Sequence, residues 1–323
     1  MHASQPKYVL ALDFGGTKLA AALVDLSAGE ILESVVQPTP SDQGADSLRT
    51  MLQMGRQAVN KCAVSLVNLD GVGISFGGPI SQDRRSVLRS LHVKDWDAFP
   101  LADYMADTFG VPASMDNDGN AAALGEWYFG AGRETENMLY IQASTGVGAG
   151  LILERRIYRG QGLAGEFGHL TVMADGPLCA CGKRGCVESL TAGWALARCG
   201  QAAYEKAGPG SALKMLGDQA SGQIDARLVL EACRQGDPAA KEMVERGFKY
   251  LGVGICNAVV LLDPQMVAIG GGISRAWDVM YPQLQSALAV YLPPMFQNRV
   301  RLEWSQLKGT ETLLGAALLT RGY

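Results

Sequence analysis

YVLALDFGGTKLAAALVD, residues 8–25, decides the fold that we predict for this chain. An apolar run, a turn with two glycines and a second apolar run are typical of a β-hairpin. The same layout returns at residues 138–154, where MLYIQ is followed by the turn ASTGVGAG and by LILE. Strands and helices alternate along the chain around both hairpins. The sequence therefore predicts an α/β protein built from a duplicated unit.

The other elements follow from hydrophobic periodicity and from turn residues. We expect further strands at 31–36, 71–76 and 265–270 and a short strand that ends at Met115-Asp116. We expect helices at 48–62, 101–109, 121–129, 243–262, 274–291 and 311–321. This order predicts a small N-terminal α/β domain at 1–125 and a larger one at 126–310. The C-terminal helix, about 311–323, is expected to pack back on the small domain.

The composition and net charge restrict the classes of binding partner that we expect. The chain has 323 residues, of which 48% are hydrophobic, and a net charge of −4. This balance argues against nucleic acid and anionic membranes as partners and favours small molecules or another copy of the chain. The apolar run Tyr8–Leu12 is too short for a signal peptide, and seven cysteines do not form a disulfide framework. We therefore expect a cytoplasmic protein.

The most specific motif is HLTVMADGPLCACGKRGC, residues 169–186, which offers His169, Cys179, Cys181 and Cys186 as ligands. Three thiolates and an imidazole suit tetrahedral Zn²⁺, and a closed set of four protein ligands indicates a structural metal. The alternative is buried cysteines that never meet a metal. Glu166 and Glu188 bracket this loop, so they are either carboxylates fixed for binding or ordinary surface groups.

Glycine-rich turns mark candidate phosphate contacts. In Asp13-Phe14-Gly15-Gly16-Thr17-Lys18 the glycines let backbone N–H groups approach a phosphate, and Asp13 can hold a hydrated Mg²⁺. The turn at 144–148 could form the second half of a clamp on one triphosphate. Gly270-Gly271-Gly272 fits close approach to an adenosine or a phosphate. Ordinary hairpins and loop-to-helix turns use such residues too.

Asn117-Asp118 lies between a predicted strand and a predicted helix. An aspartate at this position is commonly a helix cap. The functional alternative is a general base that takes the proton of a hydroxyl group as its oxygen attacks a phosphoryl group.

Taken together, these motifs resemble those of the ROK family, which contains sugar kinases and sugar-responsive repressors with an actin-like ATPase (ribonuclease H-like) fold. The resemblance covers nearly the whole chain. It rests on the segments already quoted, on FGGPI (76–80) and NDGNAAALGE (117–126), and on Glu166-Phe167-Gly168-His169 and CACGKRGCVE (179–188).

The resemblance implies roles for individual residues. It makes Asp118 the catalytic base and His169 both a zinc ligand and a residue near the sugar. The sugar contacts that it implies are Gly78, His92, Asn117, Asp118, Glu166, His169 and Glu188. The residues expected to border ATP and Mg²⁺ are Asp13, Gly15, Gly16, Thr17, Lys18, Thr145, Gly146 and Gly271.

One segment departs from the family pattern. Many relatives carry an asparagine in a pattern like PNLPGW, whereas this chain has Leu91-His92-Val93-Lys94-Asp95-Trp96. His92 is therefore either a replacement sugar contact or an exposed loop histidine. The departure leaves the phosphoryl chemistry unchanged and puts the identity of the sugar in question.

The resemblance implies ATP-dependent phosphorylation of a hexose to its 6-phosphate, with glucose as the first substrate. An N-acetylated hexosamine, such as N-acetylmannosamine or N-acetylglucosamine, and fructose are the alternatives. A sugar-responsive regulator without catalysis is the alternative of another class. Because seven residues precede the first predicted strand, we expect no DNA-binding domain of the kind that family repressors carry. Relatives are commonly dimers or tetramers, so we also expect a homo-oligomer.

Overall fold

The computed structural model describes residues 7–40, 43–62, 68–89 and 94–323, so His92 lies outside the described residues. Its contacts divide the chain into two compact units. The first unit contains the described residues of 1–140, 150–165 and 306–323, and the second contains residues 141–149 and 166–305. The domain limits expected from the sequence, 1–125 and 126–310, stay a prediction.

Two mixed five-stranded sheets confirm the predicted α/β class. The strands are β1 (Tyr8–Phe14), β2 (Lys18–Asp25), β3 (Glu30–Pro38), β4 (Gly71–Phe76), β5 (Ala113–Asn117), β6 (Met138–Ala143), β7 (Val147–Leu153), β8 (Arg156–Ile157), β9 (Met266–Gly270) and β10 (Arg301–Trp304). The α-helices are α1 (Gly44–Lys61), α2 (Leu101–Phe109), α3 (Asp118–Phe129), α4 (Val187–Thr191), α5 (Gly193–Tyr204), α6 (Ala212–Gln219), α7 (Ala226–Arg234), α8 (Pro238–Leu262), α9 (Trp277–Tyr291) and α10 (Glu311–Leu318). Short 3₁₀ turns are η2 (Phe167–His169), η3 (Ile273–Ala276), η4 (Pro294–Phe296) and η5 (Leu319–Arg321).

The strand order supports the predicted duplication. The first sheet runs β3-β2-β1-β4-β5, and the second, read from its short edge strand, runs β8-β7-β6-β9-β10. In the first sheet β1 pairs antiparallel with β2 and parallel with β4, and in the second β7–β8 is antiparallel and β9–β10 is parallel. Each sheet therefore begins with a hairpin and continues by crossover connections.

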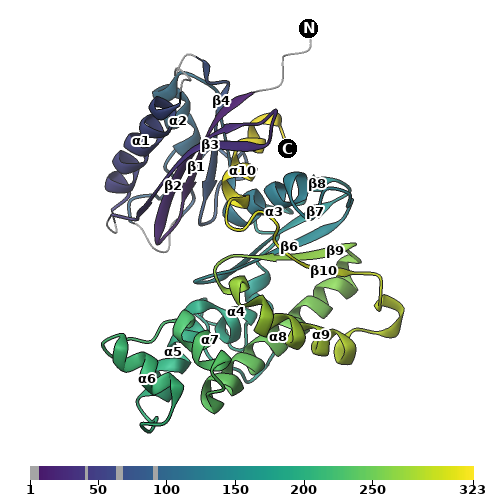
Figure 1. The fold of residues 1–323 in the computed structure, drawn as a ribbon. Helices are drawn as coiled ribbons and strands as arrows, with labels where there is room; N and C mark the ends of the chain where they lie inside the picture. The colour runs from purple at the N-terminus through teal and green to yellow at the C-terminus, as the bar shows by residue number, and fades with distance from the viewer. Residues whose placement is uncertain (1–6, 41–42, 63–67, 90–93) are drawn as a thin grey trace. The chain divides into compact units, whose positions relative to one another are not determined.

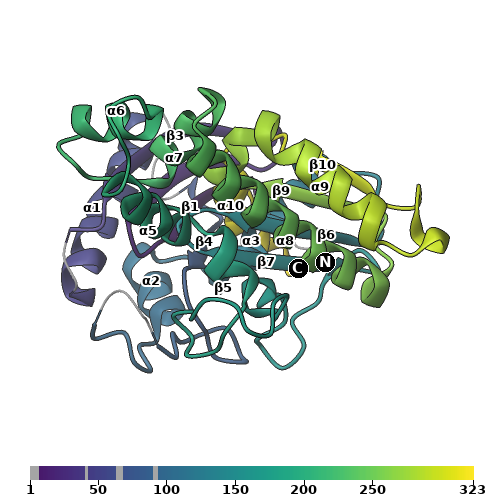
Figure 2. The same ribbon diagram turned by 90° about the horizontal axis from the view of Figure 1, so that it is seen from below.

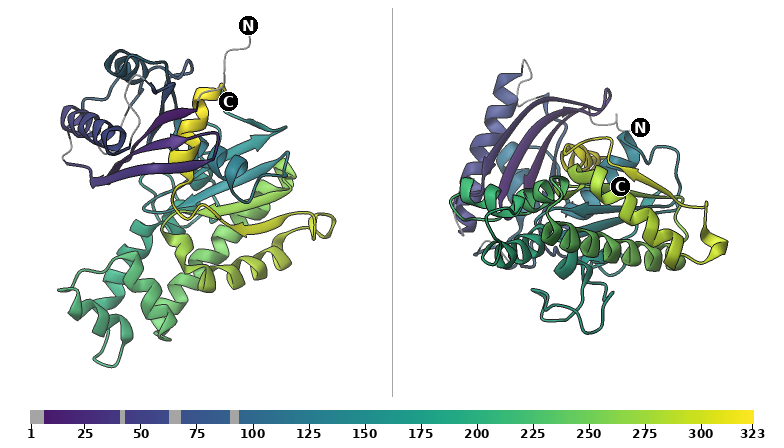
Figure 3. Two further views of the ribbon diagram at one scale, coloured as in Figure 1. Left: turned by 45° about the horizontal axis from the view of Figure 1, so that its top comes forward. Right: turned by 60° about the horizontal axis from the view of Figure 1, so that its bottom comes forward.

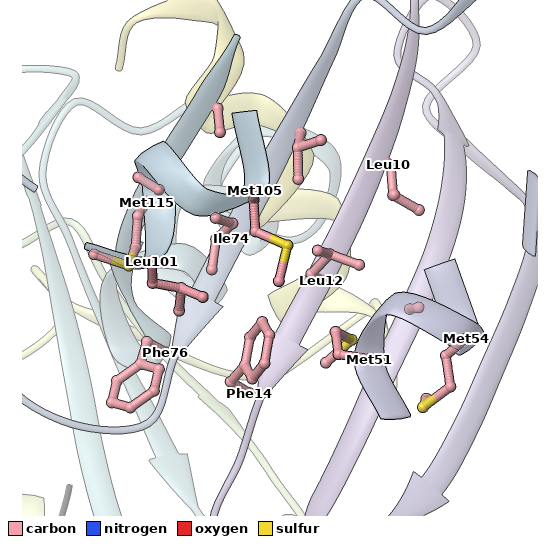
Figure 4. Close-up of a cluster of buried hydrophobic side chains, with 14 of the residues drawn as sticks. Leu10, Leu12, Phe14, Met51, Met54, Ile74, Phe76, Leu101, Met105 and Met115 are labelled. Atoms are coloured by element: carbon pink, nitrogen blue, oxygen red, sulfur yellow. The ribbon is translucent and has the colours of Figure 1, made fainter. Parts of the chain in front are cut away.

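Helices α1 and α2 cover one face of the first sheet (Figure 1). Leu10, Leu12 and Phe14 alternate along β1 and are almost fully buried against this layer. Figure 4 shows them together with Met51 and Met54, which belong to α1. This cluster holds β1 in position at the end where Asp13 and the glycine turn follow.

Helix α10 covers the opposite face of the first sheet (Figure 3). A Cβ atom added to Gly73 in β4 would lie 1.9 Å from the carbonyl oxygen of Ala316, so only glycine permits this approach. The same helix contacts α3, where a Cβ on Gly315 would lie 1.6 Å from the carbonyl oxygen of Ala121. Backbone therefore packs directly on backbone in this layer.

Outside β9, β10 and its parts of β6 and β7, the second unit is mostly helical. Figure 2 shows its longest helix, α8, beside α9, and a Cβ on Gly252 would lie 2.4 Å from that of Ala287. Asp237 caps α8 by accepting a hydrogen bond from the N–H of Ala240, and Pro238 occupies its first turn. Within the described part of the chain, α8 included, no helix is long and apolar enough to cross a membrane.

Candidate functional site

The first glycine turn closes the hairpin between β1 and β2. The N–H of Gly15 donates to the carbonyl oxygen of Lys18 at 3.1 Å, and Thr17 and Lys18 are exposed at the tip. Asp13 precedes the turn and is 8% exposed; its Oδ1 accepts a hydrogen bond of 2.8 Å from the hydroxyl of Ser75. Burial raises the pKa of the Asp13 carboxyl. A nearby cation would therefore stabilise its ionised form.

A second glycine pair, after β4, lies beside this turn. The N–H of Gly77 donates to the carbonyl oxygen of Phe14 at 2.9 Å. A Cβ on Gly77 would lie 3.7 Å both from the Cα of Gly15 and from Oδ2 of Asp118. The first unit therefore brings the predicted phosphate turn and the predicted base into one neighbourhood.

Aromatic rings pack together at the residues that precede the two glycine pairs. Trp96 is 3% exposed and meets Phe14 edge-on at 5.6 Å between ring centroids and Phe76 edge-on at 5.5 Å. Phe14 and Phe76 each precede one of the glycine pairs. Trp96, which ends the segment that departs from the family pattern, thus fixes the residues from which both turns begin.

Asn117, rather than Asp118, is the N-cap of α3. Its Oδ1 accepts a hydrogen bond of 2.8 Å from the N–H of Gly119, and its Nδ2 lies 3.4 Å from the carbonyl oxygen of Gly78. Asp118 is the first helical residue, and its Oδ1 shares the N–H of Gly119 at 2.9 Å. Asn117 is therefore the cap, and the carboxylate of Asp118 is a second acceptor in the first turn of α3.

Sequence reasoning missed an ion pair under this site. Asp116, 1% exposed, accepts a hydrogen bond of 2.7 Å from Nε of Arg159 at one oxygen and of 2.9 Å from Nδ2 of Asn120 at the other. The pair anchors the residue directly before Asn117. No local pattern could have found it, because the two partners lie 43 residues apart.

The second glycine turn, at 144–147, belongs to the second unit. The N–H of Ser144 donates to the carbonyl oxygen of Gly146 at 2.9 Å, and the N–H of Val147 donates to Oε2 of Glu188 at 3.0 Å. A Cβ on Gly146 would lie 2.9 Å from that same carboxylate oxygen. Glu188 therefore holds the turn and needs a glycine beside it.

The four predicted metal ligands converge in the second unit. The potential ligand atoms of His169, Cys179, Cys181 and Cys186 all lie within 4.8 Å of one another. The sulfurs of Cys181 and Cys186 are 3.7 Å apart, and Nδ1 of His169 is 3.9 Å from the sulfur of Cys179. In a tetrahedral zinc site with Zn–S bonds of about 2.3 Å, two sulfurs lie about 3.8 Å apart. The cluster thus has the dimensions of such a site.

The two bracketing glutamates lie beside this cluster. Oε2 of Glu166 is 3.8 Å from Nε2 of His169, the ring nitrogen other than the one nearest Cys179. Oε1 of Glu188 is 4.0 Å from the sulfur of Cys179. At 3.8 Å the Glu166 carboxylate lies near His169 without a hydrogen bond to it, whereas Glu188 bonds to the turn at 144–147. The cluster, the two glutamates and the turn at 144–147 are therefore one connected assembly.

A cavity of about 510 Å³ opens next to this turn. It is bordered by the first turn of α5, by α7 and by η3, and its lining includes Ser144, Thr145, Trp194, Arg227, Arg234, Gly272 and Arg275. Gly271 has φ +85°, and a Cβ there would lie 2.4 Å from the carbonyl oxygen of Ala143. Only glycine fits at this crossing of β6 and the loop after β9.

The predicted site residues divide between the two units. The first unit holds Asp13, Gly15, Gly16, Thr17, Lys18, Gly78, Asn117 and Asp118. The second unit holds Thr145, Gly146, Glu166, His169, Cys179, Cys181, Cys186, Glu188 and Gly271. Ser75, Arg159 and Trp194 were not predicted from the sequence, because none of them belongs to a recognised motif.

Two mixed sheets of the same strand order, each opened by a glycine-bearing hairpin, define an α/β protein of the actin-like ATPase fold. The model of the ROK family matches residues 9–322, and the chain belongs to this family.

Known relatives include sugar kinases. A glucokinase of Thermotoga maritima is 30% identical over 320 residues, which cover 97% of each chain. An N-acetylmannosamine kinase of Yersinia pseudotuberculosis is 32% identical over 316 residues, covering 97% of this chain and 98% of that protein. The crystal structure of a ROK family glucokinase from Streptomyces griseus, in complex with glucose and AMPPNP, is similar with a TM-score of 0.85 and 32% identity. It covers 98% of this chain and 100% of that chain.

Proposed function

We propose that this protein is an ATP-dependent hexose kinase with glucose as its main substrate. The glucokinase relatives support sugar phosphorylation. The observation that carries the proposal is the position of Asp118, whose Oδ2 and the Cα of Gly15 would each lie 3.7 Å from a Cβ on Gly77. A carboxylate at the start of α3 thus stands beside the turn expected to meet phosphate.

In the proposed reaction Asp118 accepts the proton of the sugar 6-hydroxyl. The freed oxygen forms a bond to the γ-phosphorus of ATP while the bond from that phosphorus to the β–γ bridging oxygen breaks. The products are a hexose 6-phosphate and ADP. Backbone N–H groups of the turns at Gly16-Thr17 and Thr145-Gly146 are proposed to meet the phosphates.

Mg²⁺ would be held by Asp13 and would neutralise phosphate charge when bound. A single buried carboxylate fits this ion, because Mg²⁺ usually keeps several of its waters and binds few protein groups. Asp13 is oriented for this role by the hydroxyl of Ser75.

The sugar contacts proposed are Gly78, Asn117, Glu166, His169 and Glu188, together with His92, which lies outside the described residues. Carboxylates and amides bind sugar hydroxyls by directional hydrogen bonds. The relative that is an N-acetylmannosamine kinase favours an N-acetylated hexosamine as the second candidate substrate. A substrate panel that compares glucose with sugars carrying an acetamido group distinguishes the two candidate substrates.

The cluster of His169, Cys179, Cys181 and Cys186 is proposed to hold a structural Zn²⁺. Four protein ligands leave no position for a reacting water. Burial raises the pKa of the Cys186 thiol to about 12, so a bound cation has to displace that proton. The metal would fix the loop that carries Glu166 and Glu188.

The test is ADP release measured with ATP, Mg²⁺ and a panel of glucose, fructose, N-acetylmannosamine and N-acetylglucosamine. Asp118→Asn should lower turnover by about 10²- to 10⁴-fold and change sugar affinity by less than about tenfold. Asp107→Asn, an exposed position on α2, is the matched control and should leave turnover unchanged.

Near-normal turnover of the Asp118→Asn variant would exclude Asp118 as the base. Binding of a hexose without turnover of any sugar by the unmodified protein would instead favour a regulator. A cytoplasmic location and a homo-oligomer remain part of the proposal, and sedimentation of the purified protein tests the second.

A further inference from the structure

Trp194 lies in the first turn of α5 and lines the cavity beside the turn at 144–147. Its N–H donates to the carbonyl oxygen of Thr145 at 3.2 Å, and the N–H of Gly193 donates to that of Ser144 at 2.8 Å. Two backbone hydrogen bonds therefore fix the start of α5 to this turn.

The surroundings of the indole leave part of it open to the cavity. The guanidinium of Arg198 lies over the ring at 5.0 Å from its centroid. Arg198 does not line the cavity, whereas Trp194 and Ala197 do. Trp194 is half-buried and lines the cavity, so part of its surface is accessible there. A cavity of about 510 Å³ is large enough for one small molecule.

The charges around the cavity favour an anionic ligand. Arg234 is held by both oxygens of Asp278, at 2.9 and 2.8 Å, and Arg227 lies 3.7 Å from Asp225. Arg275 is exposed on the same cavity and, among the residues that the structure describes, pairs with no carboxylate. An aromatic ring, an unpaired guanidinium and a glycine turn form a set that fits a nucleotide, which combines a flat base with phosphates.

We propose that Trp194 is the surface on which the base of the phosphoryl donor stacks and that Arg275 binds the donor's phosphates. This inference rests on the proposed kinase function and adds the residue that makes the donor site select a nucleotide over inorganic polyphosphate. Neither residue belongs to a motif that the sequence singled out. Stacking on Trp194 would stabilise the bound base of the nucleotide, whereas the guanidinium of Arg275 would stabilise its phosphate charge.

Titration calorimetry with adenosine, ADP and inorganic tripolyphosphate separates the two contributions. Trp194→Ala should weaken adenosine and ADP about 10- to 100-fold and change tripolyphosphate less than about twofold. Trp194→Phe keeps an aromatic face and should stay within about threefold of the unmodified protein. Arg275→Ala should weaken ADP and tripolyphosphate and leave adenosine unchanged.

Trp277→Ala is the matched control, because Trp277 stacks on Tyr281 at 5.1 Å and does not line the cavity. It should leave all three affinities unchanged. Circular dichroism and thermal unfolding establish that each variant is folded before its affinities are compared.

If the unmodified protein binds ADP and the Trp194→Ala variant binds it equally well, the inference is wrong and the kinase proposal stands. If a folded Trp194→Ala variant loses tripolyphosphate as strongly as ADP, the ring acts by holding the turn and the stacking role is also wrong. If the unmodified protein neither binds ADP nor turns over ATP with any hexose, the proposed function itself fails.

Discussion

Replacement of Arg159 by methionine should destabilise the protein strongly, because it leaves the carboxylate of Asp116 buried without its cation. The side chain of Asp116 is 1% exposed and that of Arg159 is 25% exposed. Removing one partner of a fully buried ion pair costs about 3–5 kcal/mol. Asn120 still donates to Asp116, and Arg159 is partly solvated, so we expect about 2–3 kcal/mol, below that range. Methionine keeps the apolar packing of the arginine stem.

Urea denaturation followed by circular dichroism gives the free energy of unfolding. Arg299→Met is the matched control, because Arg299 pairs with Asp263 at 2.7 Å while both side chains are about half exposed. An exposed pair contributes about 0–1 kcal/mol. Adding Asp116→Asn to Arg159→Met should recover much of the loss, since it removes the unpaired charge. Equal destabilisation by Arg159→Met and Arg299→Met would refute the reasoning.

Three further changes have outcomes that follow from the structure. Gly315→Ala should lower the free energy of unfolding by about 1–3 kcal/mol, because α10 must move away from α3. Gly208→Ala is the control and should not lower it, because the space around Gly208 is open. Equal urea midpoints of the two variants would contradict this prediction. Burial acts to raise the pKa of Asp237, but hydrogen bonds to its carboxylate outweigh that effect and lower it. The Asp237 carboxylate thus stabilises the folded protein above about pH 4, and this stabilisation is lost as the pH falls through the pKa of Asp237 in the folded state. Asp237→Asn should therefore be less stable than the unmodified protein at pH 6 and closer to it in stability at pH 3. Cys181→Ala should abolish zinc binding measured by elemental analysis, and Cys199→Ala should not; a zinc-free unmodified protein would disprove the metal site.

Much of the fold could be predicted from local sequence. The strand at residues 71–76 and the helix at 101–109 have the predicted limits, because an apolar run or an amphipathic period ends there at glycine. β10 was missed because it is an edge strand whose residues are exposed or half-buried, so it carries no continuous apolar signal. Helices α4 to α7 are not among the helices that the sequence predicts.

The candidate site was predictable where motifs are contiguous. The cysteine and histidine ligands converge as expected, since their spacing already fits one loop. The geometry at Asn117 and Asp118 was not predictable, because either residue could have been the cap. Contacts between distant segments, such as Arg159 with Asp116 or Glu188 with Val147, leave no periodic signature.

The tight fit of α10 against β4 and α3 bears on how the chain folds during synthesis. The sheet that starts at Tyr8 lacks the cover of one face until residues 311–318 have left the ribosome. Pairing across about 300 positions is slow, and the nascent first sheet stays open to aggregation or to chaperones until then. Translation of residues 311–318 is thus the event that allows the sheet begun at Tyr8 to be covered on both faces.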